Sequence, residues 1–311
     1  MEPKLLLTDI ANIMGCTIHN VHMLIKEKNI QTSKKSNRVY ITDPSEFKKL
    51  VNLPIPKKTI CVQTAKGGIG KTVLTASIAI RLWQYGARVL LVDLDQQANL
   101  TKNILNKKID LTLMDILEDK ATINQVIQKK FEGLDILPSS IKNSILNQHM
   151  TAYGLSPENT LSDILDPIKD NYDIIMFDCP PAIGHIVTSC VYPSNLIIAP
   201  IDPDDDAVDG MRFCWSEVQK INKKTKTKRE FRIILNKYDQ RTIMSTKILN
   251  TLLSFEDIKD CLYTTIIGVS QEFTAAKNEK ISIFDSPRQG KATKDIDSVV
   301  LEILGISKEE N

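Results

Sequence analysis

The feature that most constrains this chain is a glycine-rich run, K-G-G-I-G-K-T, at residues 66–72. Residues 59–64 before it read as a buried strand, and residues 73–85 after it have an apolar pattern of helical period that ends at Gly86. Such a turn between a strand and a helix is typical of a phosphate-binding loop. Its glycines let successive backbone N–H groups point toward phosphate oxygens, and the helix presents its positive end to them. The chain is therefore expected to bind a nucleoside triphosphate.

The two polar residues that close the run have separate expected roles. Lys71 is expected to contact the β- and γ-phosphates, and the Thr72 hydroxyl to ligate Mg²⁺. The predicted cofactors are therefore ATP and Mg²⁺. The predicted nucleotide-binding residues of the loop are Gly67, Gly68, Ile69, Gly70, Lys71, Thr72 and Val73.

One departure from the ordinary loop is informative. The usual pattern, G-x-x-x-x-G-K-[ST], would place glycine at position 65, where this chain has Ala65 followed by Lys66. This form resembles the deviant loop of the ParA/MinD family. The resemblance implies that Lys66 reaches across a dimer to the partner's nucleotide, as an arginine finger does in GTPases. The alternative, a surface lysine beside a glycine turn, is disfavoured because these residues seldom coincide at these spacings.

The remainder of the chain predicts an α/β fold, a doubly wound and mainly parallel sheet of the P-loop type. Helical stretches separate six apolar runs, at residues 88–93, 134–138, 172–178, 196–201, 231–236 and 263–267. Ligands of such sheets gather at the carboxyl ends of the strands, so polar residues that end these runs are candidate site residues.

Four such residues match family motifs. By the resemblance, the segment V-D-L-D-Q-Q-A-N implies that Asp95 orients the attacking water and that Asp93 supports the magnesium shell and the loop. The segment D-C-P-P similarly places Asp178 beside Mg²⁺, and Asn236 is implied to contact the adenine. A helix-capping role is the alternative for Asp93. The resulting catalytic set is Lys66, Lys71 and Asp95, and the metal set is Thr72, Asp93 and Asp178.

Two further features near these motifs, a cysteine and an acidic run, are not interpreted as metal sites. Cys179 suggests an iron–sulfur or redox role, which we reject because no second cysteine stands at the spacing of the related nitrogenase iron protein. The acidic run at residues 202–206 lacks the spacing and glycine of an EF-hand, and we interpret it as a nucleotide-side or partner-facing loop.

A small module is expected before the nucleotide-binding domain. Two short helices around Gly15, capped by Thr8 and Thr17, precede a basic turn and strand at 33–41 and a helix starting at Pro44. The pattern resembles a winged helix-turn-helix of the MerR/excisionase kind. The predicted boundaries are 1–51 for this module, 52–58 for a Pro-rich linker and 59–311 for the ATPase domain.

Charge supports contact of this module with DNA. Residues 1–58 hold ten Lys/Arg and five Asp/Glu, so their charge is +5, while the whole chain is only +2. The second helix is expected to enter the major groove and the basic turn to hold phosphates. A solvated helical cap or a dimerisation arm is the alternative. The predicted contacts are Thr17, His19, Asn20 and His22 for bases, and Lys34, Lys35 and Arg38 for the backbone.

A second basic region is expected to hold DNA of any sequence. It centres on a cluster at 220–229, where a solvated loop is the alternative interpretation. The predicted contacts on an ATP-bound dimer are Lys223, Lys224, Arg241 and Lys247.

Composition indicates the cellular compartment in which such a protein is expected. Six cysteines without a C-x-x-C pair are typical of reduced thiols in the cytosol, and no apolar stretch approaches the ~18 residues that a membrane helix needs. The tail at 299–311 ends acidic, whereas a MinD-type membrane-targeting helix is basic and amphipathic. We expect a cytoplasmic, nucleoid-associated protein without membrane contact.

The resemblance therefore implies a partition ATPase with weak intrinsic turnover. It would form a homodimer with ATP, bind non-specific DNA and be stimulated by a ParB-like centromere-binding protein. The N-terminal module would bind operator DNA and autoregulate the operon. The alternatives are a MinD-like positioning ATPase and an ATP-sensing transcription repressor.

Overall fold

A computed structural model describes residues 2–35, 37–105, 107–181, 184–279, 281–285 and 290–306. The chain divides into two compact units. The first gathers residues 1–56, 77–87 and 270–311, and the second holds residues 57–76 and 88–269. The predicted linker at 52–58 includes the first point where the chain passes from one unit to the other. The acidic end of the tail, at 307–311, lies outside the described residues.

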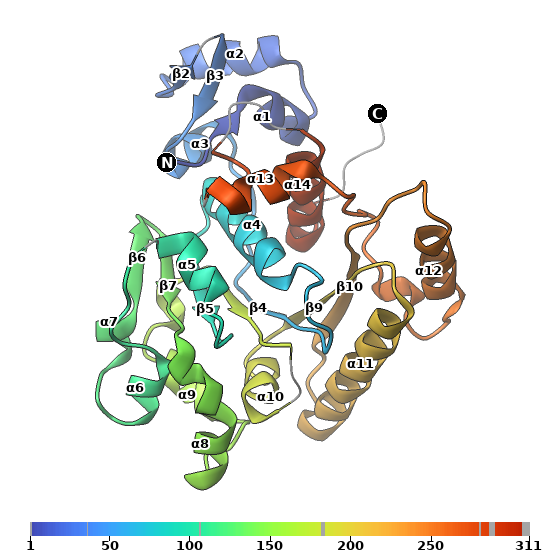
Figure 1. Cartoon of the computed structure of the whole chain (residues 1–311). Coiled ribbons are helices and arrows are strands. Elements are labelled where there is room, and N and C mark those ends of the chain that lie inside the picture. Colours follow the sequence, from blue (N-terminus) through green and yellow to red (C-terminus); the bar gives the residue numbers. More distant parts are fainter. Residues whose placement is uncertain are drawn as a thin grey trace. The chain divides into compact units, whose positions relative to one another are not determined.

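The second unit is built on a seven-stranded sheet in the order β10-β9-β4-β8-β5-β7-β6 (Figure 1). Every neighbouring pair is parallel except β6 and β7. The predicted α/β class with a mainly parallel sheet is therefore confirmed. The strands are β4 (Lys58–Val62), β5 (Val89–Asp93), β6 (Gln128–Phe131), β7 (Leu134–Leu137), β8 (Ile174–Asp178), β9 (Leu196–Ile201) and β10 (Glu230–Leu235).

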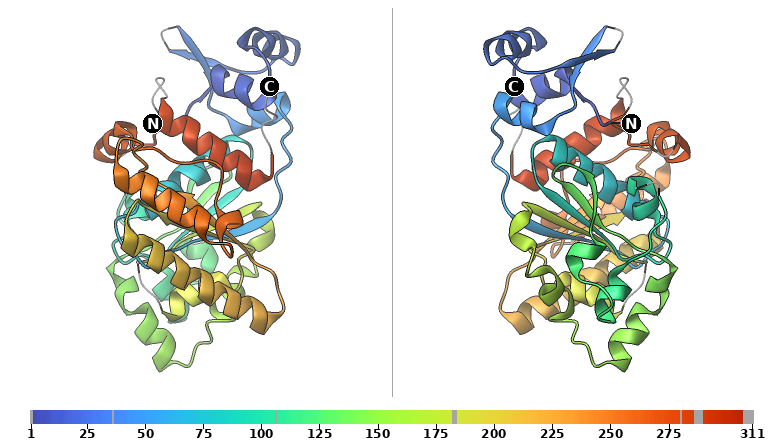
Figure 2. Two further views of the ribbon diagram at one scale, coloured as in Figure 1. Left: turned by 90° about the vertical axis from the view of Figure 1, so that its right-hand side faces the viewer. Right: turned by 90° about the vertical axis from the view of Figure 1, so that its left-hand side faces the viewer.

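Continuous apolar sequence explains why these strands are central. All residues of β5, β8 and β9 are buried, as expected for strands of a parallel sheet that is covered on both faces. On one face their side chains form a single hydrophobic core with residues of the surrounding helices. The long helix α11 is seen in front of the sheet as the gold helix in the left-hand view of Figure 2.

The helices of this unit lie between the strands in sequence. They are α5 (Asn99–Leu105), α6 (Leu113–Leu117), α7 (Ile123–Val126), α8 (Leu146–Ala152), α9 (Thr160–Leu165), α10 (His185–Val191), α11 (Asp205–Thr225) and α12 (Ile243–Ser254). Short 3₁₀ helices occupy η1 (Ile141–Ile145), η2 (Lys169–Asn171) and η3 (Lys259–Cys261). Helix α4 (Lys71–Gln84) begins in this unit and continues into the first.

The prediction of a regular strand at 263–267 is wrong. Backbone N–H groups of Tyr263 and Ile267 do donate to β10, at 3.0 and 2.9 Å. Only isolated bridges result, however, and the segment is not a strand of the sheet. An apolar run predicts burial, but it does not predict the continuous pairing that defines a strand. The antiparallel edge strand β6 was not predicted, because Q-K-K-F carries little apolar signal.

The first unit contains the three predicted N-terminal helices and the strand after the basic turn, together with β1, which was not predicted, and β2, which lies where a turn was expected. They are β1 (Leu5–Leu6), α1 (Leu7–Met14), α2 (Ile18–Glu27), β2 (Ser33–Lys35), β3 (Arg38–Ile41) and α3 (Pro44–Leu50). The three strands form an antiparallel sheet in the order β1-β3-β2. The unit also contains α13 (Gln271–Glu279) and α14 (Lys291–Leu304). Among the described residues, no helix combines the length and apolar character needed to cross a membrane.

Local capping explains where these helices start. Thr17 accepts a hydrogen bond from the Asn20 N–H at 3.2 Å, as predicted. Helix α3 starts at Pro44, also as predicted, and Asp43 caps it. Thr8, in contrast, is not the cap of α1. The Asp9 carboxylate accepts the Leu6 N–H at 3.2 Å, so the helix begins at Leu7 instead.

A buried arginine joins helices of the first unit. The Arg81 side chain on α4 has no exposed surface and lies 3.5 Å from Asp9 and 2.5 Å from Asp297. Its guanidinium also stacks over the Phe284 ring at 4.0 Å. Because a buried charge is costly unless it is paired, these acidic partners hold α1, α4 and α14 together.

Candidate nucleotide-binding site

The glycine-rich loop connects β4 to the first turn of α4, which is the predicted context. Gly68 and Gly70 have φ angles of +76° and +96°, a region that residues with a Cβ rarely adopt. At Gly70 space is limiting too, since a Cβ would lie 2.6 Å from the Asn236 amide nitrogen. The loop therefore requires glycine for both conformation and close approach.

Lys71 lies at the start of α4 with its side chain largely buried. Its ammonium donates to the carbonyl oxygen of Lys66 at 2.9 Å and of Thr64 at 3.4 Å. Burial lowers the pKa of Lys71, although the nearby Asp178 charge opposes this. Phosphate oxygens are stronger partners for an ammonium than neutral carbonyls. Lys71 is thus placed to transfer its contacts to a phosphate at the helix N-terminus.

Asp178 ends β8 beside the loop-bearing strand β4, where it pairs in register with Val62. The residue is fully buried, and no hydrogen bond of ordinary geometry reaches either carboxylate oxygen from the described residues, although the Thr72 hydroxyl lies close enough to act on the group. Burial, and then the charge of Asp93, raise its pKa well above the ordinary value, while Thr72 and Lys71 act to lower it. A buried carboxylate with so little hydrogen bonding is suited to a cation. Asp178 and the Thr72 hydroxyl therefore fit a Mg²⁺ site.

Asp178 carries a prediction for stability. Because its folded pKa is raised, the native state binds this proton more tightly than the unfolded state, and the ionised group destabilises the fold as pH rises above about 4. In Mg²⁺-free buffer, Asp178→Asn should raise the melting temperature by about 2–6 °C at pH 8, and by less at pH 5. It should also remove stabilisation by Mg²⁺ with nucleotide.

The measurement is thermal unfolding of both chains at the two pH values. Asp95→Asn is the matched control, because Asp95 is only partly buried. A lower melting temperature for Asp178→Asn at pH 8 would show that the carboxylate has a stabilising partner.

The segment after β5 is held by Asp93. One Asp93 oxygen accepts the N–H and hydroxyl of Thr101 at 2.8 and 2.7 Å, and the other accepts the Asp95 N–H at 3.1 Å. Burial raises the Asp93 pKa to about 6, although these hydrogen bonds oppose the shift. With its oxygens already occupied, Asp93 is better suited to support the loop than to contact Mg²⁺ directly.

Asp95 is positioned by its own backbone. Its Oδ1 accepts the Gln97 N–H at 2.9 Å, and its carbonyl oxygen accepts the Ser139 hydroxyl at 2.6 Å. Its Oδ2 has no donor among the described residues. This oxygen is the part of Asp95 that remains able to orient a water.

Lys66 is paired with the acidic run that follows β9. Its Nζ lies 2.7 Å from Asp204 and 3.5 Å from Asp202, with 27% of the side chain exposed. Although burial disfavours the charged form, hydrogen bonding to Asp204 and the Asp202 charge raise the pKa of Lys66. The acidic run therefore lies beside the phosphate loop, and Lys66 is engaged within its own chain.

This pairing predicts that Asp204 slows hydrolysis. If Lys66 acts on a partner's nucleotide, Asp204→Asn removes a competing contact and should raise ATP turnover about two- to five-fold, the scale of an exposed ion pair. Asp205→Asn is the matched control, since Asp205 instead pairs with Lys247. Equal turnover of the Asp204→Asn protein and wild type, measured by phosphate release, would contradict the competition.

Two residues that follow β10 donate hydrogen bonds to the phosphate loop. The Asn236 amide donates to the Ile69 carbonyl at 2.8 Å, and the Lys237 ammonium donates to the Gly68 carbonyl at 2.6 Å. Asn236 is the residue predicted to contact the adenine, a role that stays a prediction, whereas Lys237 was not predicted to belong to the site. The signal for Lys237 was its place at the end of a buried strand.

The predicted basic contacts of the second unit are mostly ion-paired. Lys224 pairs with Glu158, Arg241 with the neighbouring Asp239 at 2.7 Å, and Lys247 with Asp205 at 2.8 Å. Lys223 is exposed in the last turn of α11. Exposed ion pairs are worth little, so these cations can exchange to phosphates.

The predicted DNA contacts of the first unit fall into two groups. Thr17, His19 and Asn20 are exposed at the start of α2, and Lys34 and Lys35 are exposed in β2.

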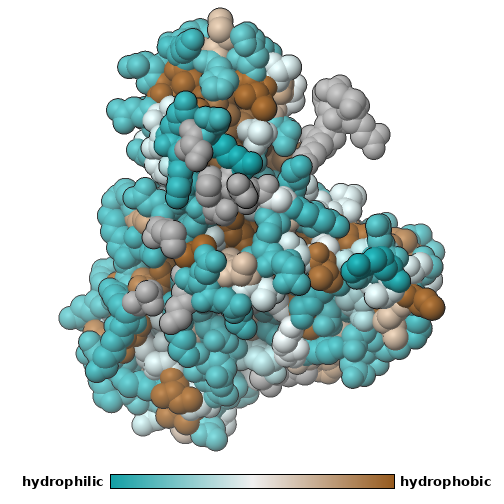
Figure 3. All heavy atoms as spheres, turned by 45° about the horizontal axis from the view of Figure 1, so that its top comes forward, coloured by the Kyte–Doolittle hydropathy of each residue, from teal (hydrophilic) through white to brown (hydrophobic). Residues whose placement is uncertain are grey.

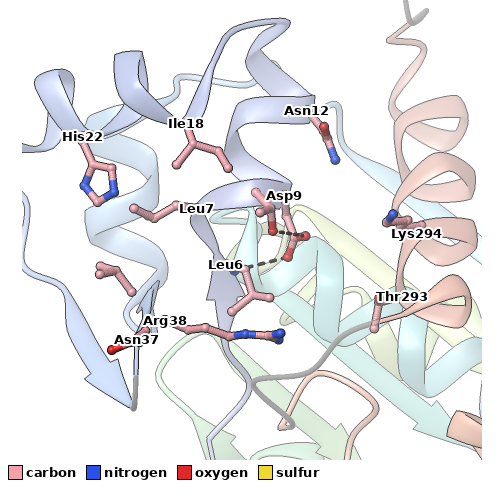
Figure 4. A pocket seen from close by; sticks show the side chains of 12 residues that line it. Leu6, Leu7, Asp9, Asn12, Ile18, His22, Asn37, Arg38, Thr293 and Lys294 are labelled. Carbon is pink, nitrogen blue, oxygen red and sulfur yellow. Dashed lines mark hydrogen bonds between the residues drawn. The ribbon is translucent and has the colours of Figure 1, made fainter.

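His22 and Arg38 are also exposed, and they line a pocket of about 530 Å³ (Figure 4). Leu6, Leu7 and Ile18 provide its apolar wall. Hydrophobic residues are gathered on the face of the N-terminal part that is turned forward in Figure 3. His22 and Arg38 therefore share a partly apolar hollow, whereas the other five predicted contacts are on open surface.

A sheet of this order with a glycine loop, a basic residue at the helix start and a buried aspartate defines a P-loop nucleotide-binding protein. A family model described as an AAA domain matches residues 57–233. The chain belongs to this family, as a P-loop ATPase of the ParA/MinD type.

Named relatives agree with this membership. The chain is 28% identical over 239 residues to the sporulation initiation inhibitor protein Soj of Bacillus subtilis, covering 75% of this chain and 93% of Soj. Its fold is similar to an ATP complex of McdA from Cyanothece, with TM-score 0.69, 18% identity, and 83% and 100% of the two chains covered. A putative plasmid partition protein of Borrelia burgdorferi bound to AMPPNP gives TM-score 0.66 at 19% identity, covering 80% and 98%.

Proposed function

We propose that this protein is a DNA-segregation ATPase of the ParA kind, which binds and hydrolyses ATP with Mg²⁺. The observation that carries the proposal is that the two lysines of the phosphate loop have different contacts. Lys71 lies at the helix start and donates to the carbonyls of Thr64 and Lys66, whereas Lys66 points to the acidic run. Named relatives include a chromosome-partitioning ATPase Soj of Treponema pallidum, 26% identical over 249 residues.

The residues at the carboxyl edge of the sheet have separate roles in phosphoryl transfer. Lys71 and the loop N–H groups bind the phosphates, and Thr72 and Asp178 hold Mg²⁺, which neutralises phosphate charge when bound. Asp95 orients the attacking water through Oδ2, while Asp93 keeps that loop in place. Little acid–base chemistry is needed, because the reaction depends on positioning and charge stabilisation.

Dimerisation completes the site in this proposal. Lys66 leaves Asp204 and Asp202 and reaches the nucleotide of a second copy, so intrinsic turnover in a single chain is expected to be weak. The test is the molar mass of the full chain in solution with ADP or a non-hydrolysable ATP analogue. We expect monomers with ADP and dimers with the analogue. Monomers under both conditions would contradict the proposal.

DNA contacts link this cycle to segregation. The ATP-bound dimer would bind DNA of any sequence through Lys223, Lys224, Arg241 and Lys247, and a ParB-like centromere-binding partner would stimulate hydrolysis and release. The protein would then associate with the nucleoid.

The N-terminal helices and hairpin would bind operator DNA as a winged helix-turn-helix. Arg38→Ala should weaken operator binding and reduce the slope of log K against log salt by about 0.9, the value for one lost phosphate contact. Affinity measured over a salt series tests this, and Lys26→Ala, an exposed position on α2 outside the predicted contacts, is the control. An unchanged slope would remove Arg38 from the interface.

A further inference from the structure

Three cysteines that are far apart in the sequence lie close together in the hydrophobic core, next to the strand that ends in Asp178. Cys61 lies in β4, Cys179 directly follows β8, and Cys190 lies in α10. Their sulfur atoms all lie within 4.8 Å of one another, and Cys61 and Cys179 are separated by 3.5 Å. All three are at most 1% exposed. We call this group the thiol cluster.

Strand register disfavours a disulfide in the thiol cluster. Cys61 pairs directly with Phe177 across β4 and β8, so Cys179 stands diagonally from Cys61. Adjacent strands lie about 4.8 Å apart and two residues advance about 6.6 Å along a parallel strand, so these Cα atoms are about 8 Å apart, whereas disulfides need about 4.4–6.8 Å. Joining these two sulfurs would therefore require movement of the central sheet.

A shared cation requires no such movement. Metal–thiolate bonds of about 2.3 Å arranged in a plane place the sulfurs about 4 Å apart, which lies within the range found here. We propose that Cys61, Cys179 and Cys190 bind one thiophilic d¹⁰ cation, of the class of monovalent copper or divalent cadmium and zinc. Binding converts the three thiols to thiolates and releases their protons to solvent.

The surroundings select against hard cations. The thiol cluster is part of the hydrophobic core that covers one face of the sheet, and its three ligands are sulfur atoms. Mg²⁺ and Ca²⁺ prefer oxygen, whereas soft cations prefer thiolate. The site is therefore distinct in chemistry from the proposed Mg²⁺ site at the neighbouring Asp178.

The test uses the full-length chain, reduced and free of oxygen. Cys16 and Cys261 are partly exposed, so both are first replaced by serine to remove surface thiols. Cd²⁺ is titrated and followed by the ultraviolet absorption of cadmium–thiolate bonds and by proton release. Cu⁺ is titrated separately against a chromophoric chelator. We expect one equivalent to bind with the absorption of three sulfur ligands.

Two variants in that background assign the ligands. Cys190→Ser should weaken binding at least about 100-fold, since loss of a ligand exceeds the 10–100-fold cost of losing an outer-shell partner. Cys214→Ser is the matched control, because Cys214 is another buried thiol outside the thiol cluster, and its binding should be unchanged. Cys61→Ser is an independent ligand variant, and circular dichroism establishes that each variant is folded.

The proposal is overturned if neither Cd²⁺ nor Cu⁺ binds the folded background protein. It is also overturned if binding is equal in the folded Cys190→Ser and Cys214→Ser proteins. In either case the three thiols serve only to pack the core.

Discussion

The Lys71→Ala protein is expected to lose nucleotide binding while remaining folded. Charge-assisted hydrogen bonds contribute about 1.5–3 kcal/mol each, so loss of contacts to two phosphates should weaken ATP binding by at least about 100-fold. Among the described residues, the hydrogen bonds that the substitution removes are those from the Lys71 ammonium to the carbonyls of Thr64 and Lys66. Binding is measured by calorimetry with Mg²⁺ and ATP, and by the fluorescence of a labelled analogue.

Lys237→Ala is the matched control for this variant. Lys237 is a second lysine that donates to the same loop, at the Gly68 carbonyl, but its side chain is 46% exposed. We expect its removal to weaken ATP binding only a few-fold. If Lys71→Ala bound ATP as tightly as the control, the loop would not be the phosphate site.

The Lys66→Ala protein, unlike Lys71→Ala, should retain ATP binding and lose hydrolysis. A trans-acting cation of this kind is worth roughly 10³–10⁵ in rate in GTPases, so turnover should fall to background. Because Lys66 contacts the acidic run in its own chain, its removal should not disturb Lys71. Single-turnover phosphate release, measured beside nucleotide affinity, separates the two steps. Lys129→Ala, an exposed lysine in β6, is the control.

A mixing experiment tests whether Lys66 acts across a dimer. Lys66→Ala and Asp95→Ala homodimers should each be inactive. In a mixed dimer, one site combines the intact Asp95 of one chain with the intact Lys66 of the other, and activity should return. Turnover of the mixture no greater than the sum of the separate proteins would assign Lys66 a role within its own chain.

The sequence predicted those parts of the site that depend on local order. A strand, a glycine turn and a helix are contiguous, and apolar runs that end in Asp93 and Asp178 identify the carboxyl edge of a parallel sheet. These features need no knowledge of tertiary contacts. The same rule failed at 263–267, because an apolar run does not show whether its backbone pairs continuously.

Contacts between distant segments could not be predicted in this way. Lys66 and Asp204 are separated by many elements, and they meet only because β4 and β9 are neighbours. The thiols that surround Cys179 were not predicted for the same reason. Its neighbours Cys61 and Cys190 come from another strand and a helix, so the spacing along the chain gave no sign of them.

Binding to random-sequence duplex DNA with ATP, with ADP and without nucleotide, with turnover recorded in the same samples, tests the partition proposal most directly. We expect tight binding only with ATP, a steep fall in affinity with salt, and slow hydrolysis that DNA stimulates. Binding that is absent or independent of nucleotide would contradict the proposal. ATP-dependent capture by lipid vesicles would then favour a positioning ATPase, and sequence-specific operator binding with negligible turnover would favour a repressor.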